Sequence, residues 1–173
     1  HFSGNGPFTK KVEKWLEEFL GAERILLTHS CTAALEMSSM ILGLGPGDEV
    51  IMPSFTFVTT ASSIMRSGAK PVFCEIDENM LIDLDDLKRK ITDRTKAILP
   101  VHYAGSAPNM DELSLICESN SLEMIEDSAQ GLGSTWKGRS LGTFGKLGAV
   151  SFHETKNIHC GEGGAIITNN KKY

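Results

Sequence analysis

Short apolar runs alternate with longer amphipathic stretches along almost the whole chain. Helical segments are expected near 31–43, 56–67, 83–91 and 109–119, and the less regular stretch 128–146 is a further candidate. Alternating strands and helices predict an α/β fold with three layers, in which a mostly parallel sheet carries helices on both faces. The seven candidate strands are 25–27, 50–52, 72–74, 97–99, 122–125, 149–150 and 165–167.

Both ends of this pattern have distinct features. A helix is predicted before the first strand, opened by Pro7 and Thr9 and closed by Gly21. The last two strands are joined by only about a dozen residues, and a parallel crossover needs more chain, so the last strand should be antiparallel. The apolar stripe of the first helix consists of Val12, Trp15, Leu16, Phe19 and Leu20.

Composition excludes several classes of protein. The chain has 173 residues, 40% of them hydrophobic, which suits a single domain. Its net charge of -5 argues against nucleic-acid binding, and no apolar run suggests a membrane span or a signal peptide. Four separated cysteines with no CxxC pair indicate reduced thiols in a cytoplasmic protein, with no metal site. The chain starts without Met and stops just after a strand, so we expect it to be cut from a longer one.

Polar and aromatic residues follow the predicted strands, where α/β enzymes place their sites. After the first strand, Ser30 and Thr32 open a helix among small residues. This helix start could bind an anion, or Ser30 could be an ordinary N-cap. After the second strand, Phe55 and Phe57 could stack on a flat ring or pack beneath the loop. His102 follows the fourth strand, where a structural role is the commoner one for a lone histidine.

The fifth strand ends in two carboxylates, Glu126 and Asp127. A buried carboxylate costs free energy unless it is paired, and a protonated pyridine nitrogen is one suitable partner. Strand alternation puts the two side chains on opposite faces, and the pattern alone does not choose between them. Asp127 could equally be a helix cap.

Lys156 lies in the polar loop 151–157, directly after the sixth strand. A lone loop lysine is usually only solvated, but at a strand end its amine could form a Schiff base with an aldehyde cofactor. The strand ends together supply an anion pocket, aromatic rings, a buried acid and an amine. These are the groups that bind pyridoxal 5'-phosphate (PLP), so the sequence predicts a PLP enzyme.

Several runs resemble the sugar-nucleotide aminotransferases of the DegT/DnrJ/StrS type. They are 30–35 (SCTAAL), 45–50 (GPGDEV), 53–57 (PSFTF), 100–105 (PVHYAG), 125–130 (IEDSAQ), 137–139 (KGR), 151–157 (SFHETKN) and 161–164 (GEGG). The resemblance implies that residues 1–173 form a fold-type I, PLP-dependent transferase large domain with a seven-stranded sheet. It also implies that an N-terminal segment and a C-terminal small domain are absent.

The resemblance assigns roles to individual residues. Lys156 would hold PLP as a Schiff base, and Asp127 would pair with the pyridine nitrogen; these two are the implied catalytic residues. Phe57 would stack on the ring, and Gln130 would lie near its phenolic oxygen. The implied phosphate-binding residues are Thr32, Ala33 and Ser151.

The implied reaction moves an amino group from L-glutamate to the keto group of a nucleotide-linked sugar, in a homodimer of the full-length protein. The sequence of the lysine loop is most similar to the corresponding sequence in enzymes that act on dTDP-4-keto-6-deoxyhexoses. Sugar dehydratases of the same family are an alternative, but they carry histidine in place of Lys156. A nicotinamide enzyme would need GxGxxG after a strand, whereas the glycines of 43–47 precede one. A non-catalytic, truncated PLP-binding or interaction fragment is the remaining alternative.

Overall fold

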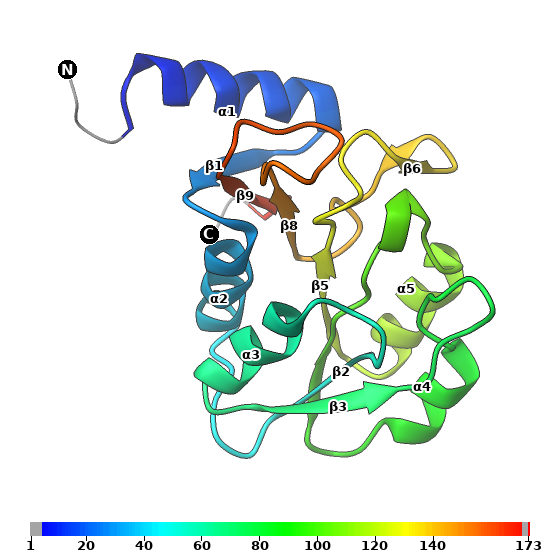
Figure 1. Cartoon of the computed structure of the whole chain (residues 1–173). Coiled ribbons are helices and arrows are strands. Elements are labelled where there is room, and N and C mark those ends of the chain that lie inside the picture. Colours follow the sequence, from blue (N-terminus) through cyan, green and yellow to red (C-terminus); the bar gives the residue numbers. More distant parts are fainter. Residues whose placement is uncertain (1–4, 171–172) are drawn as a thin grey trace.

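The computed structural model describes residues 5–170 and 173, and its centre is a seven-stranded sheet (Figure 1). The strands are ordered β1–β9–β8–β5–β4–β2–β3 across the sheet. All seven strands expected from the sequence are present, which confirms the predicted α/β fold. Their bounds are β1 (Arg24–Thr28), β2 (Glu49–Pro53), β3 (Lys70–Cys74), β4 (Thr95–Ile98), β5 (Glu123–Asp127), β8 (Leu147–Ser151) and β9 (Gly164–Thr168).

β9 runs against both of its neighbours, β1 and β8. The other neighbouring pairs, from β8 through β5, β4 and β2 to β3, are parallel. The predicted reversal of the last strand is therefore confirmed. Because β9 is reversed, its first residue, Gly164, lies at the same edge of the sheet as the carboxyl ends of the parallel strands.

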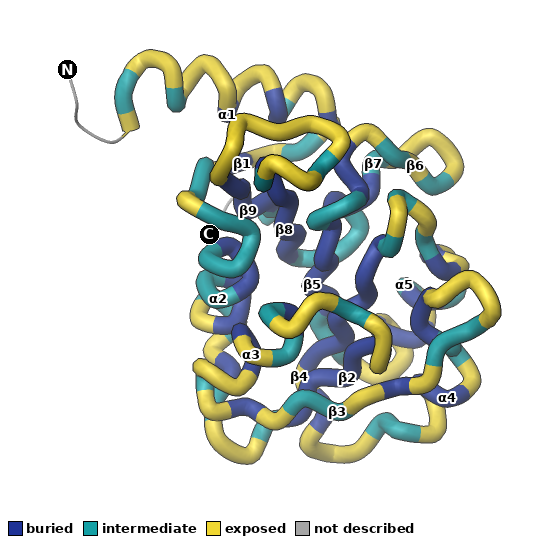
Figure 2. Tube along the Cα trace, in the orientation of Figure 1, coloured by how far each residue is buried: buried dark blue, intermediate teal, exposed yellow. Residues whose placement is uncertain are grey.

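Helices cover both faces of the sheet, and strand alternation decides which residues meet which layer. Val50 and Met52 of β2 pack with α2 (Cys31–Ile41) and α3 (Val58–Arg66). Ile51, between them, packs with α4 (Leu84–Lys90) and α5 (Met110–Ser119) on the other face. Figure 2 shows the strands as the buried centre between these layers.

The first helix, α1 (Pro7–Leu20), ends as predicted at Gly21, which adopts a left-handed conformation with φ 67°. Leu16 and Leu20 are buried against β8 and β9. The rest of the predicted apolar stripe is not buried, since Val12, Trp15 and Phe19 are 42%, 52% and 46% exposed. The core therefore uses only one flank of the stripe.

The predicted helix at 128–146 is wrong. This segment forms turns and a two-stranded hairpin, β6 (Thr135–Trp136) and β7 (Arg139–Ser140). Lys137 and Gly138 at the hairpin tip have φ values of 49° and 84°, which no helix accommodates. A short 3₁₀ turn at Tyr103–Gly105, also not expected, follows β4. Within the described residues, no helix is long and apolar enough to cross a membrane.

Candidate active site

A cavity of about 380 Å³ opens at the carboxyl edge of the sheet, within the size range of small-molecule sites. Its walls come from the N-terminus of α2, the loop before α3, the end of β5 and the loop 152–163. Six of the seven predicted cofactor-binding residues line it, while Ala33 does not. The six are Thr32, Phe57, Asp127, Gln130, Ser151 and Lys156.

Asp127 presents a buried carboxylate to this cavity and is only 4% exposed. Its Oδ2 accepts a hydrogen bond from the Thr60 hydroxyl (2.7 Å), and its Oδ1 accepts one from the Ala129 backbone N–H (3.1 Å). Burial raises the pKa of Asp127, although these two hydrogen bonds and the charges of His102 and Lys156 act against the shift. The site therefore holds a carboxylate that lacks a fully compensating cation.

Glu126 lies on the opposite face of β5 and has a structural role. Its Oε2 is 2.8 Å from His102 Nε2 and accepts the Gly142 N–H at 2.8 Å. Its Oε1 accepts the Gly145 N–H at 2.7 Å. Glu126 thus fixes the turns 142–145 in which the sequence suggested a helix. His102 is fully buried beside it, as a structural histidine.

The N-terminus of α2 forms one end of the cavity. Ser30 is its N-cap, with Oγ accepting from the Ala33 N–H at 3.1 Å. The Ala34 N–H bonds to the Ser30 carbonyl at 3.3 Å. Among the residues that the structure describes, this leaves the N–H groups of Cys31 and Thr32 as first-turn donors for an anion. The two interpretations of Ser30 are therefore compatible, but Ala33 already has a hydrogen-bond partner.

Two phenylalanines after β2 have different environments. Phe55 packs edge-on against Tyr103, with ring centroids 4.9 Å apart. Phe57 immediately precedes α3, lines the cavity and is 71% exposed. Of these two phenylalanines, Phe57 is therefore the one with a ring available to stack on a flat ligand in the cavity. Across the cavity, Gln130 Oε1 accepts the Ala104 N–H at 2.7 Å, which leaves the amide NH₂ for a ligand oxygen.

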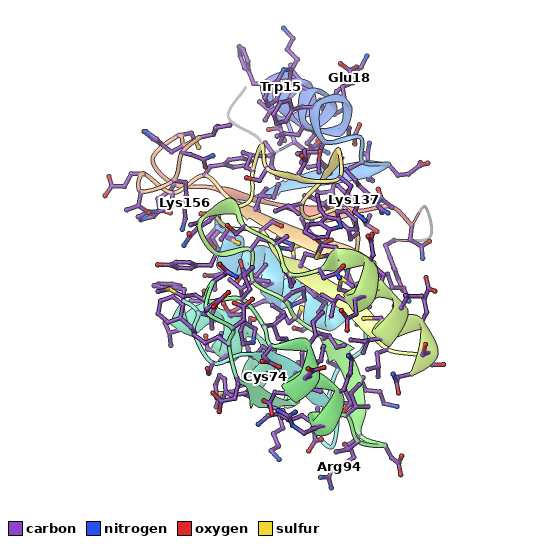
Figure 3. The ribbon with its side chains drawn as sticks, turned by 90° about the vertical axis from the view of Figure 1, so that its right-hand side faces the viewer. Trp15, Glu18, Cys74, Arg94, Lys137 and Lys156 are labelled. Atoms are coloured by element: carbon purple, nitrogen blue, oxygen red, sulfur yellow. The ribbon has the colours of Figure 1, made fainter. Side chains whose placement is uncertain are left out.

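Lys156 lies in a loop whose two sides are hydrogen-bonded to each other. Phe152 N donates to the Gly163 carbonyl (2.9 Å), and Glu154 N donates to the Gly161 carbonyl (2.8 Å). Lys156 lines the cavity, and Figure 3 labels it on this loop. Lys137, by contrast, is ion-paired with Asp111 elsewhere on the molecule.

The structure adds residues that the sequence did not indicate. Thr60 reaches Asp127 across 67 positions, and no local pattern signals such a contact. Cys31 also lines the cavity, where burial raises the pKa of its thiol; Asp127 adds to the shift and Lys156 opposes it. His153 and Glu162 face each other there, 3.4 Å apart.

These groups fit PLP in type and place. The helix N-terminus suits its phosphate, Phe57 its ring, Asp127 a protonated ring nitrogen, and the Lys156 amine its aldehyde carbon. These groups lie in one cavity although they come from the start of α2, the loop before α3, the end of β5 and the loop 152–163. The structure thus assembles the set of groups predicted from the strand ends.

The comparisons with known proteins agree with this geometry. The model of the DegT/DnrJ/EryC1/StrS aminotransferase family matches residues 1–173. The spore coat polysaccharide biosynthesis protein SpsC of Bacillus subtilis is 42% identical over 168 residues, covering 96% of this chain and 43% of that protein. GDP-perosamine synthase of Vibrio cholerae is 38% identical, covering 96% of this chain and 46% of its own length.

A solved structure from Streptococcus pneumoniae, described as a sugar aminotransferase in its PLP form, superimposes with a TM-score of 0.93. It is 34% identical, and the match covers 98% of this chain and 48% of that one. The chain thus spans about half the length of the proteins it matches. With its fold, its cavity and these matches, the chain belongs to the DegT/DnrJ/EryC1/StrS family of PLP-dependent sugar aminotransferases.

Proposed function

We propose that residues 1–173 form the PLP-binding large domain of an enzyme that transfers an amino group from L-glutamate to a nucleotide-linked keto-deoxysugar. A dTDP-4-keto-6-deoxyhexose is the proposed acceptor. The observation that carries the proposal is the presence of Lys156 and Asp127 in one cavity, with the N-terminus of α2 at its end.

Each proposed role follows from the position of the residue. Thr32 and Ser151 hold the phosphate, Phe57 covers one face of the ring, and the Gln130 amide donates to its phenolic oxygen. PLP, when bound, supplies an electron sink for the carbanion formed at the donor's Cα. Asp127 keeps the ring nitrogen protonated, which the buried position of its carboxylate favours.

Lys156 has two proposed roles. Its Nζ would hold PLP covalently at the aldehyde carbon, with the aldehyde oxygen leaving as water. With the donor bound, the free Lys156 amine would accept the proton from the donor's Cα as a general base and would then donate it as a general acid. A histidine at this position could not form the covalent link, so Lys156 favours amino transfer over the dehydratase alternative.

The partners and location remain part of the proposal. Nucleotide-sugar and glutamate are the small-molecule substrates, and we expect the complete protein to be a cytoplasmic homodimer. The name of one relative specifies a GDP-linked product. The GDP-linked 4-keto-6-deoxyhexose is therefore the competing acceptor against which the dTDP-linked sugar should be compared.

Borohydride reduction tests the role of Lys156. The chain incubated with PLP should absorb visible light, and borohydride should convert the link into a stable secondary amine. Digestion and mass spectrometry should then locate the adduct on the peptide that contains residues 151–157, because Lys156 is the only lysine among the described residues that lines the cavity.

Lys137→Ala and Lys146→Ala are matched controls, since both lysines are ion-paired outside the cavity, with Asp111 and Glu123. Both variants should be labelled like the wild type, whereas Lys156→Ala should bind PLP without forming the adduct. An adduct on any other lysine would contradict the assignment.

A further inference from the structure

Two threonine hydroxyls connect the start of α3 to the carboxylate of Asp127. The Thr60 hydroxyl donates to Asp127 Oδ2 at 2.7 Å, and Thr60 is fully buried. Its oxygen also lies 2.7 Å from the hydroxyl oxygen of Thr56, which lines the cavity. A continuous chain of hydrogen bonds therefore runs from the cavity wall to the side chain that is proposed to meet the ring nitrogen of PLP.

The chemistry of these groups fixes the direction of the chain. An ionised carboxylate can only accept hydrogen bonds, so the single hydroxyl proton of Thr60 goes to Asp127. Thr60 then has only acceptor capacity left, and the proton between the two threonines belongs to Thr56. Because a hydroxyl that accepts a hydrogen bond becomes a better donor, Thr56 strengthens the bond that Thr60 gives to the carboxylate.

The same two threonines also stabilise the first turn of α3. The N-cap residue of this helix, Phe57, makes no capping hydrogen bond with its side chain. Thr60 N donates to the Phe57 carbonyl at 3.0 Å, and the hydroxyls of Thr56 and Thr60 close the turn on either side of Phe57. The turn that carries the proposed stacking ring is thus joined to Asp127 by side-chain hydrogen bonds.

The Thr60 hydroxyl is the main group that favours the ionised form of Asp127. Burial raises the pKa of Asp127, and the bond from Thr60 is the largest of the effects that lower it. The smaller effects in the same direction are those of the Ala129 N–H and of the charges of His102 and Lys156. The Cys31 thiol of α2 supplies no countercharge, because burial and Asp127 itself raise its pKa.

We propose that Thr60 is a positioning residue of the PLP site, which holds the Asp127 carboxylate ionised and in one orientation, with Thr56 supporting it from the cavity side. Thr60 is fully buried and is not among the described residues that line the cavity, so it acts on a bound group through Asp127. This role rests on the proposed function, in which Asp127 pairs with the ring nitrogen. The state of the carboxylate can nevertheless be measured without any cofactor.

Urea unfolding of the cofactor-free chain at several pH values tests the role of Thr60. Thr60→Val removes the donor at similar volume, so the pKa of Asp127 should rise further and its charge should cost more stability. Near pH 8 the urea midpoint should fall by about 1 M. This loss should shrink as the pH falls towards about 4, where the carboxyl group becomes protonated in the unfolded chain as well.

Three further variants serve as controls. Thr60→Ser keeps the hydroxyl, so any stability lost with the methyl group should be independent of pH. Thr59→Val should keep the pH dependence of the wild type, since the described hydrogen bonds to the Asp127 carboxylate come from Thr60 and Ala129. In an Asp127→Asn background, Thr60→Val should cause no pH-dependent loss. This background also provides the comparison if Thr60→Val alone does not fold.

A loss in Thr60→Val that is equal at high and low pH would overturn the proposal, because a merely structural threonine would give that result. A pH-dependent loss that persists in the Asp127→Asn background would overturn it as well.

PLP titrations separate a failure of the Thr60 contact from a failure of the proposed function. A protonated Asp127 cannot accept the proton of the ring nitrogen, so the pH below which PLP affinity falls should be higher in Thr60→Val than in the wild type or Thr60→Ser. A shift in stability without this shift in PLP binding would support the role of Thr60 and would contradict the pairing of Asp127 with the ring nitrogen.

Discussion

At the scale of single residues, Glu126 and Asp127 show how adjacent carboxylates acquire different functions. Glu126 has three hydrogen-bond partners and fixes the turns around it. Asp127 faces the cavity, and its two hydrogen bonds compensate only part of the cost of burying its charge. A carboxylate whose pKa is raised by burial destabilises the folded chain when it is ionised. A cationic ligand atom would remove this cost, which is typical of a functional site.

Asp127→Asn should therefore stabilise the cofactor-free chain at neutral pH. The ionised form is disfavoured in the folded state, so the folded pKa lies above the unfolded one. The cost is complete above the folded pKa and disappears as the pH falls towards about 4, the range of an ordinary aspartate. Urea unfolding at several pH values should show a gain in the variant that shrinks on acidification.

The control is Glu126→Gln, which should lower stability, because the buried carboxylate there has its full set of partners. In aminotransferase assays of the full-length protein, Asp127→Asn should lose several orders of magnitude in rate. Equal pH profiles for Asp127→Asn and the wild type would refute the assignment of an unfavourable buried charge.

At the scale of elements, the distance between β9 and α2 determines the anion-binding end of the cavity. A methyl group added to Gly164 would lie 2.4 Å from Cys31 N and 2.4 Å from the Ser30 carbonyl carbon. Real side chains do not tolerate such contacts, so only glycine lets the start of β9 lie against the first turn of α2. The glycine is thus part of the site although it carries no functional group.

Gly164→Ala should lower the free energy of unfolding by about 1–3 kcal/mol and weaken PLP binding as well, because the first turn of α2 must move. Gly45→Ala is a suitable control, since a methyl group at Gly45 meets no atom within 4 Å. Chemical unfolding and spectroscopic PLP titration of both variants measure the two effects. Unchanged PLP affinity in a folded Gly164→Ala chain would contradict the role given to this contact.

At the scale of the whole molecule, the cavity has more groups suited to binding PLP than to binding the amino donor. Among the described residues, its basic side chains are those of Lys156 and His153, and His153 faces Glu162. Glutamate brings two carboxylates, and no arginine of the described part of the chain lines the cavity to bind them. The substrate groups away from the reacting carbon therefore have few partners within this chain.

We accordingly expect the 173-residue chain to bind PLP but to turn over glutamate slowly. Relative to a longer form with a complete site, its rate should be reduced about a hundredfold or more, because orientation of the substrate is lost. Stopped-flow absorbance after addition of glutamate measures the half-reaction, and a PLP titration provides the control for binding. A rate equal to that of the longer form would show that the 173-residue chain is sufficient to bind and orient glutamate.

The sequence by itself determined the strands, the reversal of β9 and the candidate groups at the strand ends. Hydrophobic periodicity and loop length are local properties, so they can be read from neighbouring positions. The segment 128–146 was misassigned, and at 142–145 its turns depend on bonds from backbone N–H groups to the Glu126 side chain, which lies outside the segment.

The hydrophobic pattern did not decide between Glu126 and Asp127 or between Phe55 and Phe57. The resemblance favoured Asp127 and Phe57, and the tertiary structure has these two at the cavity. In each pair the local patterns are equivalent, and the choice depends on which layer or loop each side chain meets. The same holds for α1, where the pattern predicted one apolar stripe and packing divided it between Leu16 and Leu20 in the core and Trp15 at the surface. Contacts between segments far apart in the chain determine which of two similar residues faces the cavity.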